Sequence, residues 1–575
     1  MRLSDYVIQF LRDQYKVDTI FTVSGGGCIF LIDSLGSTDG VKYVATHHEQ
    51  AAAIAAEGYA RMNNKLGACL VTSGPGGTNA ITGTLCSWLD SIPVIVLSGQ
   101  VNKEMSTNYT GLPLRQLGDQ EFNIVESVKN MTKYAVQVND PAQIKYHLEK
   151  ACKLATTGRP GPVWIDIPLN VQSVNINPDE LIGYEEELTS YPIDETLIDF
   201  IVEKWSTSKK PLLILGNGVR LSGGVDVIRS VLNRTNIPTI TAVNGNDIVN
   251  SDYRYYYGRF GTHAQICANT LLSECDFLLT IGTRLYVRQT GYNFESFAKQ
   301  AYRVYVDVDL NELTKPTLYP NTIVHSDAKK FIESLLTRNL PITDKTWLNE
   351  CDNHNNFPKV LQRHRDAVDY VSHYAFIEEL SKVLPRDHHI VTSDGSANVV
   401  TMQVLELTGE QRLVTNTGCA PMGYGLPAAM GASIHHKIIC IEGDGSLHLN
   451  IQELQTMKHY NLPIKLILLN NDGYLSIKIT QNTFFNKRYV ASGKSSGVTF
   501  PSFEKIIKAY DIPYCSIKTN KDIQPTLNEF LQQDGPCICE VFTDPEEYHE
   551  PKVMAKLGYD GKFIPGELKH IQWMK

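Results

Sequence analysis

Strand-like and helix-like segments alternate along most of the 575-residue chain, and this alternation limits the fold more than any other feature. Short apolar runs, at residues 67–72, 211–215 and 438–441 for example, are each followed by a longer helix-like segment. Repeats of this kind predict parallel sheets that are covered by helices on both faces. Two polar stretches, residues 171–195 and 342–359, interrupt the alternation, and we predict that they are linkers.

The length and the two linkers indicate three domains. We expect an α/β protein of three doubly wound parallel-sheet domains at residues 1–175, 190–340 and 360–545, with a tail at 546–575. The apolar fraction of 42% is enough for a sizeable core, and the net charge of −9 without a long basic run argues against nucleic-acid binding. No apolar run approaches the ~20 residues that span a bilayer. Because no signal peptide is evident and the 12 cysteines are scattered singly, we expect a cytoplasmic protein that binds no membrane.

One strand–helix–strand unit in the last third carries polar residues at the ends of both strands. Asp444, within Gly-Asp-Gly, follows one apolar strand, and Asn471 follows the next. Adjacent parallel strands end side by side, so these residues offer two oxygens to one hard cation. Gly445 and Ser446 open the intervening helix and present backbone N–H groups to an anion. The arrangement predicts Mg²⁺ bridged to a diphosphate.

This unit resembles the signature of thiamine-diphosphate-dependent enzymes, and the chain as a whole resembles their acetolactate synthase (acetohydroxyacid synthase) group. Further matching segments lie at residues 48–61, 72–79, 90–101, 418–428 and 450–454. The resemblance implies that the three domains bind the cofactor's pyrimidine, FAD and the cofactor's diphosphate, in that order. It also implies a homodimer or homotetramer, in which the first domain of one subunit faces the last domain of another.

The resemblance further assigns roles around the cofactor. Glu49 is implied to hydrogen-bond N1′ of the aminopyrimidine, and its Ala-rich helix predicts packing close enough to bury the carboxyl group. Met422 is implied to support the bend of the cofactor, and the carbonyl of Ala420 to accept from its 4′-amino group. Gly473 would add a backbone carbonyl to the metal ligands Asp444 and Asn471. The other implied thiamine diphosphate contacts are Gly26, Gly74, Asn79, Ser396, Ala397, Gly445, Ser446 and Tyr474.

Gly-rich turns in the middle domain resemble the FAD-binding domain of the same group. The implied FAD contacts are Arg159, Gly216, Arg284, Arg288, Asp307 and Asp327. Gly-rich turns after strands suit a dinucleotide's diphosphate, and arginine suits its charge. Many members of the family keep this fold without FAD, so the sequence leaves FAD open.

The reaction is predicted from which groups are present and absent. The loop at residues 24–27 carries no acid, and Ile477 stands where simple decarboxylases of this family have a glutamate. Gln120 matches the glutamine that carboligases hold near the reacting carbon. We therefore expect a transferase that decarboxylates a 2-oxo acid, with pyruvate as donor, and joins the acyl unit to a second carbonyl compound. A non-oxidative decarboxylase that releases an aldehyde is the alternative enzyme, and an inactive cofactor-binding regulatory protein is the alternative of another class.

Several departures from the group leave the acceptor open. Tyr286 and Val287 replace two acids, Asp119 replaces an aromatic residue, and Thr480 stands near the position of a tryptophan that helps to select the acceptor. Extra residues precede Gln120, and residues 544–575 do not resemble the group's closing arm. The acceptor is therefore pyruvate, 2-oxobutyrate, an aldehyde or a keto-sugar nucleotide.

Overall fold

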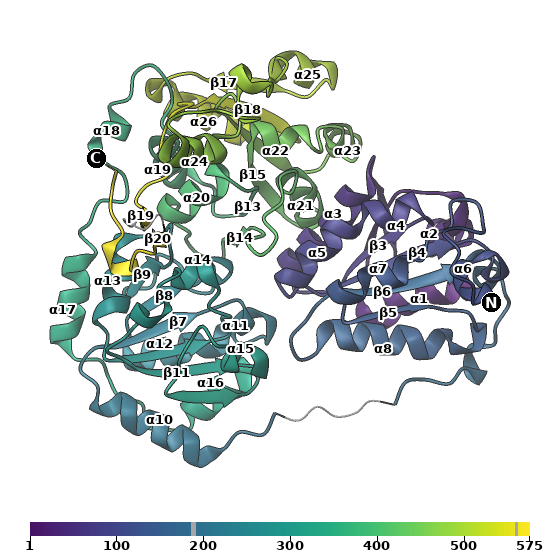
Figure 1. The fold of residues 1–575 in the computed structure, drawn as a ribbon, viewed down its shortest axis with the longest axis horizontal. Coiled ribbons are helices and arrows are strands. Elements are labelled where there is room, and N and C mark those ends of the chain that lie inside the picture. The colour runs from purple at the N-terminus through teal and green to yellow at the C-terminus, as the bar shows by residue number, and fades with distance from the viewer. Residues whose placement is uncertain (186–190, 558–561, 575) are drawn as a thin grey trace.

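The computed structural model describes residues 1–185, 191–557 and 562–574 of the chain. Three six-stranded sheets, each entirely parallel, follow one another along the sequence, and one small antiparallel pair lies in the C-terminal segment. Figure 1 shows the three units with helices packed around each sheet. The predicted α/β fold with three doubly wound sheets is therefore confirmed. No helix in the described part of the chain is both long and apolar enough to cross a membrane.

The first sheet has the strand order β2-β1-β3-β4-β6-β5. Its strands β1, β3, β4 and β6 are buried along their whole length, as apolar strands between two helical layers should be. The strands are β1 (Thr19–Thr22), β2 (Lys42–Ala45), β3 (Gly67–Val71), β4 (Val94–Gln100), β5 (Tyr134–Gln137) and β6 (Val163–Pro168). The helices are α1 (Leu3–Tyr15), α2 (Ile29–Ser37), α3 (Glu49–Asn63), α4 (Pro75–Asn79), α5 (Ile81–Leu89), α6 (Thr107–Thr110), α7 (Ile124–Val128), α8 (Ile144–Thr156) and α9 (Leu169–Gln172).

The second sheet has the order β12-β11-β10-β7-β8-β9. Its strands are β7 (Pro211–Leu215), β8 (Thr239–Thr241), β9 (Tyr256–Arg259), β10 (Phe277–Ile281), β11 (Tyr302–Asp307) and β12 (Thr322–His325). Its helices are α10 (Glu195–Thr207), α11 (Gly218–Leu221), α12 (Val225–Thr235), α13 (Ile266–Glu274), α14 (Val287–Thr290), α15 (Leu310–Thr314), α16 (Ala328–Leu336) and α17 (Lys345–His354).

The third sheet has the order β14-β13-β15-β16-β18-β17, which places β15 and β16 side by side at its centre. Its strands are β13 (His388–Thr392), β14 (Leu413–Val414), β15 (Lys437–Gly443), β16 (Ile464–Asn470), β17 (Tyr514–Ile517) and β18 (Cys537–Phe542). Its helices are α18 (Gln362–Arg365), α19 (His373–Val383), α20 (Ser396–Val404), α21 (Gly425–Ala432), α22 (Asp444–His448), α23 (Glu453–His459), α24 (Leu475–Phe485), α25 (Phe503–Ala509) and α26 (Ile523–Gln532). The antiparallel pair is β19 (Lys556–Leu557) with β20 (Phe563–Ile564).

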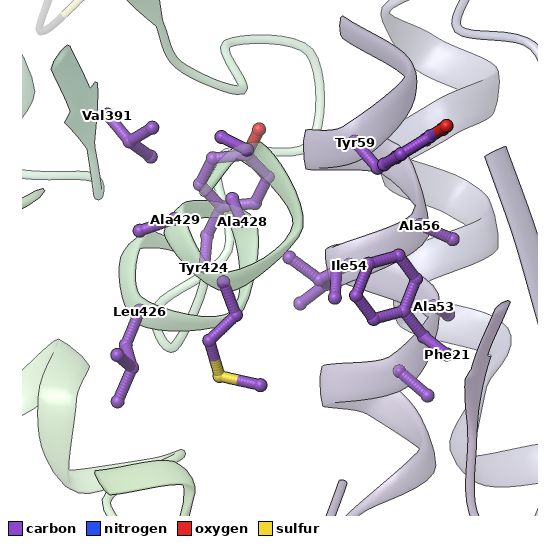
Figure 2. Packing of buried hydrophobic residues seen from close by; sticks show 14 of the residues in the cluster. Phe21, Ala53, Ile54, Ala56, Tyr59, Val391, Tyr424, Leu426, Ala428 and Ala429 are labelled. Carbon is purple, nitrogen blue, oxygen red and sulfur yellow. The ribbon is translucent and has the colours of Figure 1, made fainter. Parts of the chain in front are cut away.

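Helices α3 and α21 join the first and last domains through a very close contact. A Cβ atom at Gly58 would overlap the Ala428 carbonyl oxygen, and one at Gly431 would overlap the Ala55 carbonyl oxygen, so both positions require glycine. Figure 2 shows Ile54 directed from α3 toward α21, within one continuous apolar core. The close packing predicted for the Ala-rich helix is present, and it fixes the two domains against each other.

The prediction that residues 342–359 form a linker is wrong, because helix α17 occupies most of this segment and packs on the middle domain. Trp347 and Cys351 lie one helical turn apart and are buried against the middle domain, and the Trp347 indole donates to the Pro211 carbonyl at 3.0 Å. The predicted linker at residues 171–195 contains no strand among its described residues, and its residues 186–190 lie outside the described part of the chain.

Candidate functional site

Glu49 lies at the carboxyl edge of the first sheet, as the first residue of α3. The His48 side chain caps this helix by accepting from the Gln50 amide at 3.1 Å. The Glu49 carboxylate accepts a hydrogen bond from the Asn79 side chain at 2.9 Å. Its side chain is half-buried rather than buried as predicted, because the alanines that pack closely lie further along the helix. The carboxylate is therefore open to a ligand at this edge.

Loops at the same edge approach Glu49 and Asn79. A Cβ at Gly76 would lie 3.7 Å from a Glu49 carboxylate oxygen, and a Cβ at Gly74 would overlap the Gln120 carbonyl oxygen. Gly26 begins a short turn that is joined to the β3 loop, because the next amide, of Gly27, donates to Thr72 at 3.1 Å. The Gln120 side chain is exposed. The structure thus gathers the predicted first-domain residues at one edge of one sheet.

Asp444 and Asn471 meet at the carboxyl ends of β15 and β16. One Asp444 oxygen accepts from the Gly445 amide at 2.7 Å, and the other accepts from the Asn471 and Gly473 amides at 3.0 and 3.2 Å. Burial raises the pKa of the Asp444 carboxyl to about 6. The Asn471 Oδ1 atom is buried and has no hydrogen-bond partner. A buried acceptor without a partner is costly, and a cation would satisfy it.

These donors suit Mg²⁺. The set is one carboxylate, one amide oxygen and the backbone carbonyl of Gly473, all hard oxygens, and Mg²⁺ completes such a set with phosphate oxygens and water. Within the residues that the structure describes, no cluster of three or more His, Cys, Asp or Glu side chains could hold a metal. The geometry therefore fits the predicted magnesium site without requiring further protein ligands.

Further predicted contacts surround this pair of strand ends. A Cβ at Gly445 would overlap the ring of Tyr474, and Ser446 Oγ accepts from the Gly423 amide at 2.8 Å. Met422 keeps 39% of its surface exposed, which leaves the side chain free to contact a ligand. Ala420 adopts a left-handed backbone with φ of 52°. Strain of this kind in a residue other than glycine persists where neighbouring contacts enforce it.

Ser396 and Ala397 begin α20 beside the same edge. Ala397 is buried in the core, whereas Ser396 Oγ lies 2.9 Å from Nε2 of His549. His549 belongs to the C-terminal tail, and burial lowers its pKa well below the usual range. Sequence reasoning missed this residue, because no motif surrounds it. The tail therefore reaches a predicted diphosphate contact from more than 150 positions away.

A cavity of about 380 Å³ opens at the carboxyl ends of β7, β10, β11 and β12. Its lining includes Arg159, Arg284, Asp307 and Asp327, together with residues of the first and last domains. Gly216 supports the lining, because a Cβ there would overlap the Gly282 carbonyl oxygen.

The charges of this cavity are mixed. Arg159 contacts Asp309 at 2.8 Å and Glu312 at 2.9 Å, Arg284 lies 3.5 Å from Asp90, and burial raises the pKa of Asp307 to about 6. Arg288 does not line the cavity.

Comparison with known families identifies all three domains. The family described as thiamine pyrophosphate enzyme, N-terminal TPP binding domain, matches residues 1–126. The central domain of the same enzymes matches residues 198–335, and their C-terminal TPP binding domain matches residues 394–541. These ranges contain the β1–β4 loops, the central cavity strands and the β15–β16 edge described above.

Curated relatives align over almost the whole chain. The acetolactate synthase isozyme 2 large subunit of Escherichia coli (strain K12) is 31% identical over 560 residues, which cover 96% of this chain and 97% of that protein. The acetolactate synthase large subunit of Lactococcus lactis subsp. lactis (strain IL1403) is 30% identical, with 97% and 95% covered. Acetolactate synthase 2, chloroplastic, of Nicotiana tabacum is 30% identical, with 96% and 83% covered. The chain belongs to the thiamine pyrophosphate enzymes, in the family of the acetolactate synthase large subunits.

Proposed function

We propose that the protein is a thiamine-diphosphate-dependent carboligase, which decarboxylates a 2-oxo acid and transfers the acyl unit to a second carbonyl compound. The observation that carries the proposal is the buried, unpartnered Asn471 Oδ1 beside Asp444, an oxygen pair suited to Mg²⁺ and a diphosphate. Pyruvate is the proposed donor, because the aligned relatives bear the name acetolactate synthase.

Each group of residues has a separate task in this proposal. Asp444, Asn471 and the Gly473 carbonyl would hold Mg²⁺, and the amides around Gly445 and Ser396 would bind the diphosphate. Thiamine diphosphate, when bound, supplies the electron sink that a 2-oxo acid needs to lose CO₂. Glu49, oriented by its hydrogen bond from Asn79, would exchange a proton with N1′ of the pyrimidine.

The residues at the two proposed half-sites favour ligation over aldehyde release. Residues 24–27 are Ser-Gly-Gly-Gly, and Ile477, on α24, is 49% exposed and has no ionisable group that could donate a proton. The Gln120 side chain at the first-domain edge can donate and accept hydrogen bonds, but an amide supplies no acidic proton. An acyl unit that none of these groups can protonate survives to attack a second carbonyl compound, which is why we propose a transferase.

A donor and acceptor screen by mass spectrometry tests the proposed function. The protein, thiamine diphosphate and Mg²⁺ are incubated with pairs of 2-oxo acids, aldehydes and keto sugars. We expect a product with the mass of the donor minus CO₂ plus the acceptor. The function is wrong if every pair gives only free aldehyde, and the inactive regulatory alternative is favoured if no pair releases CO₂.

We also propose that each active site is built from two copies of the chain. In Figure 1, α3 and α5 stand between α4, which carries Asn79, and the last domain with α24. Among the residues that the structure describes, no hydrogen bond joins Glu49 or Asn79 to Asp444 or Asn471 within one chain. The His47 amide does donate to Glu453 at 3.0 Å, but Glu453 lies on α23, beyond the α22 helix that Asp444 begins. A second copy would bring the two half-sites together, as a homodimer or as the pair within a homotetramer.

Mixed oligomers of two inactive variants test this assembly. When Glu49→Gln and Asp444→Asn chains are co-expressed, we expect about one quarter of wild-type activity, because random pairing gives about half mixed dimers and each holds one intact site. Each variant alone serves as the control and should be inactive. If the mixture is as inactive as its parts, the site lies within one chain and the shared-site proposal fails.

We propose FAD as the ligand of the central cavity. The cavity lies at the strand ends where nucleotides bind in such sheets. Its lining carries Arg159 and Arg284, which now pair with carboxylates and would turn to a diphosphate when FAD binds. Purified protein should be yellow, with flavin absorbance at about 450 nm. A colourless protein that also leaves the fluorescence of added FAD unchanged would contradict this assignment.

We place the protein in the cytoplasm. The support is that all 12 cysteines lie in the described residues as free thiols, ten of them buried, as a reducing compartment allows.

A further inference from the structure

Four consecutive backbone amides, of residues 417–420, are held by only two side chains. Asp90, from the first domain, accepts from the Thr417 and Gly418 amides, both at 3.0 Å. Asn416 accepts with Oδ1 from the Cys419 and Ala420 amides at 3.1 and 3.2 Å. The loop has no regular secondary structure, so these bonds replace the backbone pairs that a helix or strand would provide. They end at Ala420, the residue with the left-handed backbone.

Both side chains are fixed in turn by buried groups of the first domain. The Asn416 Nδ2 atom donates to Glu57 Oε1 and to the Cys86 carbonyl, both at 3.1 Å. Arg61 contacts Glu57 at 2.7 Å and Asp90 at 2.6 Å. Asn416 and Glu57 are at most 3% exposed. Both N–H groups of the Asn416 amide donate and its Oδ1 atom accepts twice, so only one orientation of the side chain satisfies every partner. Buried networks of this kind are rigid.

We propose that Asp90 and Asn416 are positioning residues for the carbonyl of Ala420, through which the last domain would meet the 4′-amino group of thiamine diphosphate. The inference rests on the proposed function and goes beyond it. It assigns to the first domain a second task, that of fixing a cofactor contact in the last domain of the same chain. We call Asp90, Asn416, Glu57 and Arg61 the amide clamp.

The clamp also gives α3 two functions. Glu49 opens this helix, and Glu57 follows about two turns later on the same rigid element. Glu49 would serve a cofactor bound on the partner's last domain, whereas Glu57 holds the loop that meets the cofactor of its own chain. A shift of α3 would therefore alter both active sites of a dimer together.

The test measures exchange of the cofactor C2 proton for deuterium, by quenched NMR on the holoenzyme. Asn416→Ala should slow exchange more than tenfold, while the dissociation constants of thiamine diphosphate and Mg²⁺ stay within about twofold, because the diphosphate and metal contacts are untouched. Asp90→Asn keeps the size of the side chain but weakens one amide contact and the ion pairs with Arg61 and Arg284, so it should slow exchange less. It also supplies the readout if Asn416→Ala does not fold.

Asp18→Asn is the matched control. Asp18 joins the first and last domains through His435 at 3.1 Å and contacts Tyr59 of α3, but it does not touch the loop. Exchange in this variant should stay within twofold of wild type. The clamp is refuted if both clamp variants exchange the C2 proton at the wild-type rate. It is also refuted if their slower exchange is fully explained by a lower fraction of cofactor-bound enzyme, or if Asp18→Asn slows exchange by the same factor. Absence of exchange in the wild-type holoenzyme would instead refute the proposed function.

Discussion

Glu49→Gln is expected to abolish exchange of the cofactor's C2 proton while cofactor binding remains measurable. Glutamine can still accept the hydrogen bond from Asn79 that orients this side chain, so the fold around it should persist. It cannot take up and release a proton at N1′, and loss of such a group costs about 10²–10⁴-fold in rate. Quenched NMR of the C2 proton measures the effect, and calorimetry shows that thiamine diphosphate still binds.

Glu126→Gln provides the matched control for this experiment. Glu126 lies in the same domain, on the exposed part of α7, where it pairs with Lys129 at 2.6 Å. Exposed pairs of this kind contribute little to stability. The control should exchange the C2 proton at the wild-type rate. Undiminished exchange in Glu49→Gln would contradict the role assigned to Glu49.

Asp444→Asn should remove metal-dependent cofactor binding. The carboxylate is the one anionic donor of the proposed magnesium site, and Asn471 with the Gly473 carbonyl supplies only neutral oxygens. We expect the affinity for thiamine diphosphate with Mg²⁺ to fall at least about 100-fold, since loss of an outer-shell partner alone costs about 10–100-fold. Calorimetry with and without a chelator measures the change.

The neighbouring residue gives the control for the metal site. Asp472 lies on the same loop with a left-handed backbone, φ 53°, and its side chain is exposed. Asparagine tolerates this conformation, so Asp472→Asn should bind cofactor and Mg²⁺ as the wild type does. The metal lies elsewhere if the two variants lose the same affinity for thiamine diphosphate with Mg²⁺, or if Asp444→Asn binds them as tightly as the wild type.

The sequence predicted the strands of the sheets well, for a physical reason. Parallel strands buried on both faces are continuous apolar runs, and the run predicted at residues 211–215 has the bounds of β7 in the structure. The juxtaposition of Asp444 and Asn471 was also predictable, because adjacent parallel strands end at one edge.

Other features depend on tertiary contacts that leave no local pattern. The α17 segment is rich in Asp and Asn, and its helix depends on burial of Trp347 and Cys351 against the middle domain. The amide clamp joins Asn416 to Glu57 across 359 positions of sequence. His549 contacts Ser396 across 153 positions, in a tail that carries no motif. Only the folded chain shows that these residues meet.

The fate of labelled pyruvate tests the central claim most directly. The protein is incubated with thiamine diphosphate, Mg²⁺ and [2-¹³C]pyruvate, and the products are followed by NMR together with the release of CO₂. Carboligation predicts that the labelled carbon appears in a new carbon–carbon bond, with one CO₂ released for each ligated acyl unit. Release of CO₂ with all of the label in free acetaldehyde would contradict the account.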